Sequence, residues 1–429
     1  MTSHASTLPD SARPSGGFMD RWLREQVLKR LGALTRGRLR IRDAGGDVVL
    51  GTAEPGNGDL DALIKVNSPR FYRRIALGGS IGAADSHADG DWDSPDLTEV
   101  FRLFVRNVDL LDDMEGGLSS LANRLQLFAH RRQANSRSGS RKNILAHYDL
   151  GNQFFELFLD PTLTYSSAVF ETPLATLEEA STAKLDRICR KLGLAPHHHV
   201  LEIGTGWGSF AMHAAANFGC RVTTTTISDE QFALASERVQ AAGLGDRITI
   251  LKTDYRDLEG RFDRLASIEM IEAVGHEFLP TFFGKCGELL ADDGLMVLQG
   301  ITMPDQRYAQ YLKSSDFIRS HVFPGSCCPA LSAMLDAATR SSDLKAVGLE
   351  EIGPHYARTL ATWRDRFDEQ VEAVRALGFD ESFIRMWRYY LSYCEAGFEE
   401  RYVGTVQLAL AKPGFRGQVG AVRPLEPLA

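Results

Sequence analysis

A glycine-rich run of the chain has the composition of a ligand-binding turn. Residues 200–208 read VLEIGTGWG, a strand-like stretch that passes through three glycines into a segment typical of a helix. Gly204, Gly206 and Gly208 permit a tight turn and let a ligand approach the backbone. Ligands of open α/β sheets bind at such turns. The spacing is GxGxG with an acid, Glu202, two positions before the first glycine, which differs from the GxGxxG of dinucleotide-binding turns.

This turn resembles the first motif of the class I S-adenosylmethionine-dependent methyltransferases, so S-adenosylmethionine is the ligand that the resemblance implies. Asp254 and Tyr255 follow the third predicted strand, where the same resemblance places the residues that bind adenine. The alternative is a βα turn with a purely structural role.

Further motifs resemble one family, the cyclopropane fatty acid and mycolic acid cyclopropane synthases, over roughly residues 143–412. In chain order they are HYDLGNQFF at 147–155, LDPTLTYS at 159–166, TISDEQ at 226–231, SIEMIEAVGH at 267–276, FPG at 323–325, GPHYARTL at 353–360 and YYLSYC at 389–394. Several separated motifs in the same order make chance a poor explanation.

The resemblance implies a role for each matching position. The residues that it assigns to S-adenosylmethionine are Tyr165, Ser166, Glu202, Gly204, Thr205, Gly206, Trp207, Gly208, Thr226, Ser228, Gln231, Asp254 and Tyr255. It places Glu272, Ile301 and Tyr356 around the reacting centre, where the family holds a bicarbonate ion, and it places Cys394 beside that centre.

Two positions of the bicarbonate site depart from the family pattern. Ser167 stands where the family usually has Cys, and Gln299 stands where it usually has His. A hydroxyl and an amide NH₂ can both donate a hydrogen bond to an anion. We therefore keep Ser167 and Gln299 among the candidate catalytic residues and keep bicarbonate as a candidate ligand.

The chemistry that these residues must serve has two halves. The sulfonium methyl group is electrophilic enough for an unactivated cis double bond to attack it, which leaves a carbocation next to the methylated carbon. A base that is shielded from water then takes a proton from the new methyl group and the ring closes. If the proton is lost from another carbon, or the alkene is later reduced, the product is a methylene or methyl-branched chain. Glu272 and Tyr356 are expected to orient the base, or Glu272 is itself the base.

Less specific interpretations of single residues stay open. Glu272 could cap a helix or form a salt bridge, and Cys394 could be a packed core thiol. His147, His276 and His355 show no metal-binding spacing, so no metal site is expected. One helix face carries an aromatic stripe that suits a core or an acyl tunnel better than nucleic acid: Phe383, Trp387, Tyr390 and Tyr393.

Alternating strands and helices must position these residues, which predicts a parallel, doubly wound α/β sheet of the Rossmann-like methyltransferase class. The predicted strands cover residues 199–203, 221–226, 248–252, 265–269, 295–299 and 405–411, with helices over 209–218 and 381–400. A smaller α+β domain is expected before them, with short strand-like runs at 39–42 and 48–50, a Gly-rich acidic stretch at 78–92 and a helical run ending near Leu111.

The expected organisation has five parts. A disordered leader covers residues 1–17, a lipid-binding-like domain 18–127, a basic linker 128–142, the catalytic domain 143–415 and a tail 416–429. The segment from Phe18 to Leu34 has helical apolar spacing, and residues 18–40 hold seven Lys or Arg against two acids. Such a helix suits an anionic lipid surface, although it could also be an ordinary helix that packs on a core. The linker, with five Lys or Arg and no acid, could contact headgroups as well.

The 429 residues carry a net charge of −8, which argues against a nucleic-acid partner recognised through overall charge. Six scattered cysteines without a CxxC pair favour a reducing cytoplasm. No apolar stretch reaches the ~20 residues of a membrane span, so membrane contact is expected to be peripheral, on the inner face. A homodimer is also compatible with the sequence.

These observations predict an S-adenosylmethionine-dependent methyltransferase that forms cyclopropane rings on unsaturated phospholipid acyl chains. The N-terminal part looks like that of the longer, phospholipid-acting members of the family. The same methyl transfer with a methylene or methyl-branched product is the alternative. A non-catalytic lipid-binding protein and a small-molecule methyltransferase are the competing classes.

Overall fold

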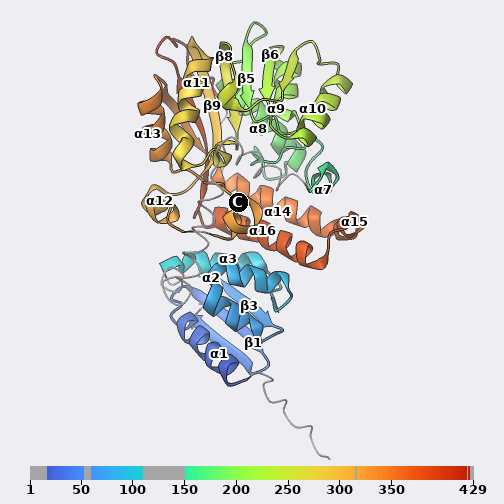
Figure 1. Ribbon diagram of the computed structural model, residues 1–429, viewed down its shortest axis with the longest axis vertical. Coiled ribbons are helices and arrows are strands. Elements are labelled where there is room, and N and C mark those ends of the chain that lie inside the picture. Colours follow the sequence, from blue (N-terminus) through green and yellow to red (C-terminus); the bar gives the residue numbers. More distant parts are fainter. Residues whose placement is uncertain (1–16, 53–58, 110–149, 315, 423, 426–429) are drawn as a thin grey trace, which may run out of the picture. The chain divides into compact units, whose positions relative to one another are not determined.

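The computed structural model describes residues 17–52, 59–109, 150–314, 316–422 and 424–425. The chain divides into two compact units, one of residues 1–123 with 381–389 and one of 124–380 with 390–429 (Figure 1). The predicted leader, except its last residue, and the basic linker at 128–142 lie outside the described residues. The sequence had placed 381–389 with the catalytic domain.

The first unit holds a four-stranded sheet in the order β2-β1-β3-β4. β1 runs antiparallel to β2 and parallel to β3, which gives the mixed α+β unit that the sequence predicted. Its elements are α1 Phe18–Leu31, β1 Gly37–Asp43, β2 Gly46–Thr52, β3 Asp61–Val66, α2 Arg70–Ala88, β4 Trp92–Asp93 and α3 Leu97–Arg106.

Two parts of this unit differ from the sequence prediction. The Gly-rich stretch at 78–92 lies mostly within helix α2, which is kinked where Gly79 adopts φ 54° and ψ −136°. Glycine reaches this backbone conformation without a Cβ clash, so the kink keeps the two helical parts joined. Strand β3 was not predicted, although its buried and partly buried residues alternate as in a strand that covers a core.

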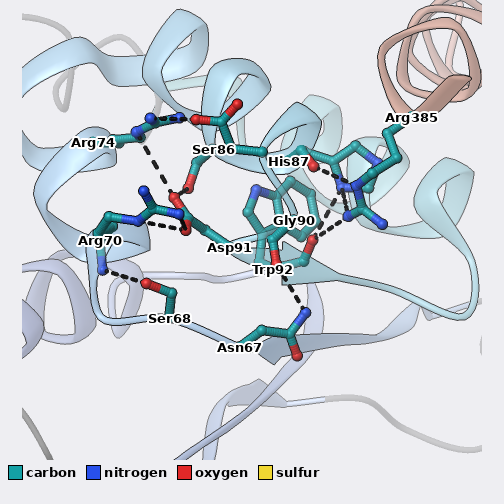
Figure 2. A network of polar contacts seen from close by, with 11 residues as sticks. Asn67, Ser68, Arg70, Arg74, Ser86, His87, Gly90, Asp91, Trp92 and Arg385 are labelled. Atoms are coloured by element: carbon teal, nitrogen blue, oxygen red, sulfur yellow. Dashed lines mark hydrogen bonds and ion pairs between the residues drawn. The ribbon is translucent and has the colours of Figure 1, made fainter. Parts of the chain in front are cut away.

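Arg385 of α16 (Glu381–Glu399) anchors the start of that helix within the first unit. Its guanidinium donates to the carbonyl oxygens of His87 at 2.6 Å and Trp92 at 2.8 Å (Figure 2). It also forms an ion pair with Asp93 at 3.1 Å. Burial and the nearby Arg385 charge lower the pKa of His87 to about 4. A long-range polar cluster therefore belongs to the core of this unit.

The second unit is built on a seven-stranded sheet in the order β10-β11-β9-β8-β5-β6-β7. The neighbouring strands from β9 to β7 are parallel, whereas β11 runs antiparallel to both β9 and β10. The strands are β5 His199–Ile203, β6 Arg221–Thr225, β7 Ile248–Leu251, β8 Phe262–Ile268, β9 Leu290–Thr302, β10 Lys345–Glu351 and β11 Gly404–Ala411. This confirms the predicted doubly wound class, with β10 as a strand that the sequence did not predict.

The helices of this unit are α7 Asn152–Glu156, α8 Leu177–Lys191, α9 Ser209–Phe218, α10 Asp229–Ala241, α11 Leu279–Leu289, α12 Asp305–Tyr311, α13 Leu331–Ser341, α14 Gly353–Glu369, α15 Val371–Ala376 and the part of α16 after residue 389. Helices α8 and α9 pack on one face of the sheet, and α11 and α13 pack on the other (Figure 1). Along β9, Leu295 and Val297 join the core cluster of α8 and α9, while Met296 and Leu298 join that of α11 and α13. Burial on both faces explains why this parallel strand is apolar throughout its centre.

Candidate active site

The predicted glycine turn lies between β5 and α9, at the carboxyl edge of the sheet. Gly204, Gly206 and Gly208 all have positive φ, which a residue with a Cβ adopts only under strain. A Cβ built on Gly206 would meet no atom within 4 Å. The backbone of the turn is therefore open to a ligand at this point.

Glu202 lies beneath that turn at the end of β5 and is 2% exposed. Its Oε2 has no hydrogen-bond partner among the described residues, and burial raises the pKa of its carboxyl to about 8. An unpaired buried carboxyl oxygen is costly unless a ligand or ion completes its bonding. The open backbone and this oxygen together fit a polar ligand with cationic groups, as S-adenosylmethionine is.

A second group of predicted residues lies between the end of β6 and the start of α10. The Ser228 hydroxyl accepts a hydrogen bond from the Gln231 backbone N–H at 3.3 Å, and the Thr226 hydroxyl donates to Gln231 Oε1 at 2.8 Å. β6 neighbours β5 in the sheet, so the structure brings this group and the glycine turn to one edge. Thr205 joins them through its hydroxyl, which lies 2.7 Å from that of Thr224 on β6.

Asp254 and Tyr255 follow β7, the strand beside β6. Arg256 binds both carboxylate oxygens of Asp254, at 2.8 and 2.6 Å. The Tyr255 ring packs edge-on against Phe282 at 5.5 Å. Both residues are thus at the predicted edge of the sheet, with Asp254 already in an ion pair.

Glu269, which the sequence analysis did not select, is the centre of the polar site. Its Oε1 accepts the Ser167 backbone N–H at 2.9 Å and the Gln299 amide at 2.8 Å. Its Oε2 accepts the Tyr356 hydroxyl at 2.7 Å. Its φ is 50°, and strained residues of this kind concentrate at functional sites. A signal existed, because the predicted strand 265–269 ended on this acid at the edge where ligands bind.

Glu272 lies one turn further along the chain and has fewer partners. Its Oε1 accepts the Ile301 backbone N–H at 2.5 Å, while its buried Oε2 has no partner among the described residues. Burial, and then the nearby Glu269 charge, raise the pKa of Glu272 to about 8. The structure thus brings Glu272 and Ile301 together, as predicted, but it joins Tyr356 to Glu269.

The residues present do not fit a bicarbonate ion held by the predicted donors. The Gln299 amide and the Tyr356 hydroxyl already bind the Glu269 carboxylate. The Ser167 hydroxyl, which we expected to donate to an anion, instead donates to the Ala168 carbonyl at 3.0 Å. A side-chain carboxylate takes the donors that the resemblance assigned to bicarbonate.

A buried polar row fixes the orientation of the Gln299 amide. Lys191 donates to Gln407 Oε1 at 2.6 Å, and Gln407 donates from Nε2 to Gln299 Oε1 at 2.9 Å. An ammonium group can only donate, so each amide in the row must present its oxygen toward Lys191. Gln299 is therefore left with its NH₂ group facing Glu269.

Tyr165 and Ser166 lie in the same interior as this polar site. The hydroxyls of Tyr165 and Tyr390 are 3.0 Å apart, and Lys184, only 1% exposed, donates to the Ser166 hydroxyl at 2.8 Å. Burial lowers the pKa of Lys184 to about 8 against the opposing charges of Glu269, Asp160 and Glu202. Lys184 was not predicted, because an apolar helix pattern gives no signal for one buried cation.

Aromatic rings pack against two tyrosines of this polar site. The Tyr356 ring stacks on Phe398 at 4.5 Å, and the Tyr165 ring tilts against Trp363 at 5.2 Å. Trp207 donates from its indole to Asn152 at 2.8 Å. Ring faces attract cations and the apolar rings exclude water.

The remaining candidates can be placed as well. Burial raises the pKa of the Cys394 thiol, as is typical of a packed thiol. Phe383 stacks on Trp387 at 5.7 Å within the first unit, whereas Tyr390 and Tyr393 contact Phe323 and Phe317 in the second. The described part of the chain holds no group of three His, Cys, Asp or Glu suited to a metal ion.

Comparison with known sequences identifies relatives over most of the chain. A family model described as mycolic acid cyclopropane synthetase matches residues 135–408. The tuberculostearic acid methyltransferase UfaA1 of Mycobacterium tuberculosis is 40% identical, over 80% of this chain and 81% of that protein. The cyclopropane-fatty-acyl-phospholipid synthase of Escherichia coli is 33% identical, over 83% and 89%.

Solved structures of cyclopropane synthases are also similar to this chain. The cyclopropane synthase MmaA2 from Mycobacterium tuberculosis has a TM-score of 0.60 at 32% identity, over 63% of this chain and 98% of that one. The mycolic acid cyclopropane synthase CmaA1, solved with SAH and CTAB, has the same score, identity and coverage. Coclaurine N-methyltransferase, at 22% identity and a TM-score of 0.53, shares the fold.

Proposed function

Because the chain belongs to the mycolic acid cyclopropane synthetase family and is an S-adenosylmethionine-dependent methyltransferase that acts on lipid acyl chains, we propose that its substrate is the cis double bond of an unsaturated phospholipid acyl chain. The observation that carries this proposal is a carboxylate, that of Glu269, held among aromatic rings at the carboxyl edge of the sheet. Such a site supplies a base and excludes water, as a carbocation intermediate requires.

The chain's residues divide into two groups by role. Glu202, the glycine turn and the Thr226 to Gln231 segment hold S-adenosylmethionine, which supplies an electrophilic methyl group. The rings of Tyr356 and Tyr165 present π-electron density to the cation that forms on the acyl chain. The polar group around Glu269 controls which proton leaves.

For the product, we favour a methylene-bearing chain as the precursor of a methyl-branched acid. A hydride shift moves the positive charge onto the methylated carbon, and loss of a methyl proton then gives C=CH₂ without any oxidant. Two observations support this choice: the base site is reorganised around Glu269, and the relative that is 40% identical is named for tuberculostearic acid, a methyl-branched fatty acid. This choice reverses the order of the two products expected from the sequence.

Cyclopropane formation is the second candidate, and it is supported by the family name and by the Escherichia coli relative. Both products arise after the same methyl transfer and differ in when the methyl proton leaves. Loss before the hydride shift closes the ring, whereas loss after it gives the methylene group.

We propose peripheral docking on the inner face of the membrane through α1. Leu23, Val27 and Leu31 face the core, while the first turn exposes Phe18 (79% exposed) and Trp22 (41%). Exposed aromatic side chains beside cationic ones suit a lipid interface. No helix in the described ranges is long and apolar enough to cross a bilayer.

The test is product analysis. The purified chain is incubated with S-adenosylmethionine and vesicles of monounsaturated phospholipid, and the released fatty acids are examined by gas chromatography and mass spectrometry. A methylene-bearing acid supports the favoured product and a cyclopropane acid supports the second candidate. Binding of S-adenosylmethionine without any methylated lipid would support a non-catalytic lipid-binding protein, and methylation of small amines alone a small-molecule methyltransferase.

A further inference from the structure

The Glu269 carboxylate has the bonding pattern of an ionised group. Ser167, Gln299 and Tyr356 each donate a hydrogen bond to it, and Lys184 contributes a positive charge nearby. Burial raises the pKa of the Glu269 carboxyl, and the hydrogen bonds from Gln299, Ser167 and Tyr356 and then the Lys184 charge oppose that rise. They do so because each of them stabilises the charged form of the acid.

Glu272 has the opposite pattern. Its Oε1 accepts a hydrogen bond from the Ile301 backbone N–H, and its Oε2 has no partner among the described residues. When two buried carboxyl groups interact, the one with fewer donors holds the proton more tightly. Glu272 is therefore the neutral member of this pair, and Glu269 is the member able to accept a proton.

Counting lone pairs identifies the accepting atom. Each carboxylate oxygen offers about two acceptor positions. Oε1 of Glu269 has two donors, the Ser167 amide and the Gln299 amide. Oε2 has one donor among the described residues, the Tyr356 hydroxyl, so these residues leave a single position on Oε2 for a substrate proton.

The backbone of Glu269 supports a functional role. Its φ of 50° lies in the left-handed region, which is disfavoured for a residue with a Cβ relative to glycine. The residue as a whole is partly exposed, although its carboxyl group is buried. A strained backbone and partial exposure are both typical of a residue that contacts substrate.

We propose that Glu269 is the resident catalytic base of this enzyme and that it acts in place of a bound bicarbonate. In the step, a C–H bond of the transferred methyl group breaks and its electron pair forms the new C–C or C=C bond. The proton passes to Oε2 of Glu269 and later to solvent, so no oxidant or reductant is needed. The proposal rests on the proposed function, because it requires the carbocation that methyl transfer creates.

The test compares Glu269→Gly and Glu269→Gln with the wild type in bicarbonate-free buffer. Glycine tolerates the left-handed backbone, and glutamine keeps the shape of the side chain while removing the base. Arg401→Gly is the matched control, since Arg401 is an exposed residue with a φ of 54° in the turn after α16. Turnover on vesicles and S-adenosylmethionine affinity by calorimetry are measured for all four proteins.

We expect both Glu269 variants to bind S-adenosylmethionine as the wild type does and to lose turnover by ~10²–10⁴-fold, the range of general-base catalysis. Arg401→Gly should keep wild-type turnover. Formate or bicarbonate should restore part of the activity of Glu269→Gly, because three donors then face an empty anion-sized space. Wild-type turnover should not respond to added bicarbonate.

Three results would overturn the proposal: a loss of less than tenfold in either Glu269 variant, loss of S-adenosylmethionine binding in both, or a bicarbonate requirement in the wild type. Failure of the proposed function would look different. In that case the wild type itself would methylate no lipid, whereas an active wild type with active Glu269 variants defeats only the role of Glu269.

Discussion

Gln407 and Gln299 stand directly opposite each other on β11 and β9, and the amide of the first donates to the oxygen of the second at 2.9 Å. Lys191 can only donate to Gln407, so this bond orients the Gln299 amide with its NH₂ group toward Glu269. The hydrogen bond that holds the base is thus determined by a residue on helix α8.

Lys191→Met should therefore change the pKa of the Glu269 carboxyl, although Lys191 donates no hydrogen bond to Glu269. Without the ammonium, the Gln407 and Gln299 amides can flip and present an oxygen to the Glu269 carboxylate, which raises the pKa of Glu269. We expect the acidic limb of the pH–rate profile to move to higher pH, and Lys191→Arg to restore it.

Lys412→Met is the matched control for that experiment. Lys412 is similarly buried and donates to the Gly287 carbonyl and to Asp343, away from the row. Both Met variants should lose stability, but only Lys191→Met should shift the pH profile. Equal profiles for the two would show that Lys191 has a structural role alone.

Gly206→Val should weaken S-adenosylmethionine binding by more than tenfold, because the branched side chain would fill the open space above the turn. The positive φ at Gly206 also costs stability when a Cβ is added. Gly243→Val separates the two effects, since Gly243 also has positive φ and open space but follows α10. Calorimetry should show wild-type affinity in the Gly243 variant, and equal losses in both variants would refute the cofactor assignment.

The contribution of Glu202 to the stability of the ligand-free protein should fall as pH rises from about 5 to 8. Burial raises the pKa of Glu202 to about 8, so the folded state holds a proton that the unfolded state releases at lower pH. The stabilising contribution is complete below the unfolded pKa and is lost as pH rises through the folded one. Glu202→Gln should flatten this decline in urea unfolding, whereas Glu178→Gln, at an exposed site, should retain it. An unchanged slope in Glu202→Gln would contradict the assignment.

Phe18→Ser with Trp22→Ser should reduce binding to anionic vesicles severalfold, and salt should weaken the wild-type interaction. Leu77→Ser, which also removes an exposed apolar side chain from the first unit, should bind as the wild type does. Flotation assays that show no effect of either aromatic change, salt or lipid charge would exclude α1 as the docking helix.

Gln299→His combined with Ser167→Cys should raise the share of cyclopropane acid, since the pair restores the side chains usual in the family. The structure adds that Gln299 is the more important of the two, because its amide binds Glu269 while the Ser167 hydroxyl does not. Gln299→His alone should therefore give most of the change. An unchanged product spectrum in the double variant would show that neither position controls the fate of the cation.

The sequence was sufficient to predict the doubly wound fold and the glycine turn because both depend on local pattern. The strand at 199–203 and the helix at 209–218 were predicted with the bounds that the structure has. Strand β10 was missed because its residues are mostly exposed, and such an edge strand lacks the continuous apolar run of a buried one.

The polar site was harder to predict, since its bonds join distant segments. Glu272 was chosen from its motif, yet Glu269 three residues earlier binds the Tyr356 hydroxyl from α14. Lys184 and Lys191 gave no signal, because their partners, Ser166 and Gln407, come together only in the folded sheet.

The first unit depends on a segment that the ribosome makes late. Arg385 and His87 are 298 positions apart, and residues 381–389 belong to the same compact unit as the N-terminal strands. During synthesis, the N-terminal strands and helices emerge long before Arg385, so their partner is missing while most of the second unit is being made. Folding of this unit is therefore completed only after residues 381–389 have been made, which departs from the usual order in which one domain folds before the next is made.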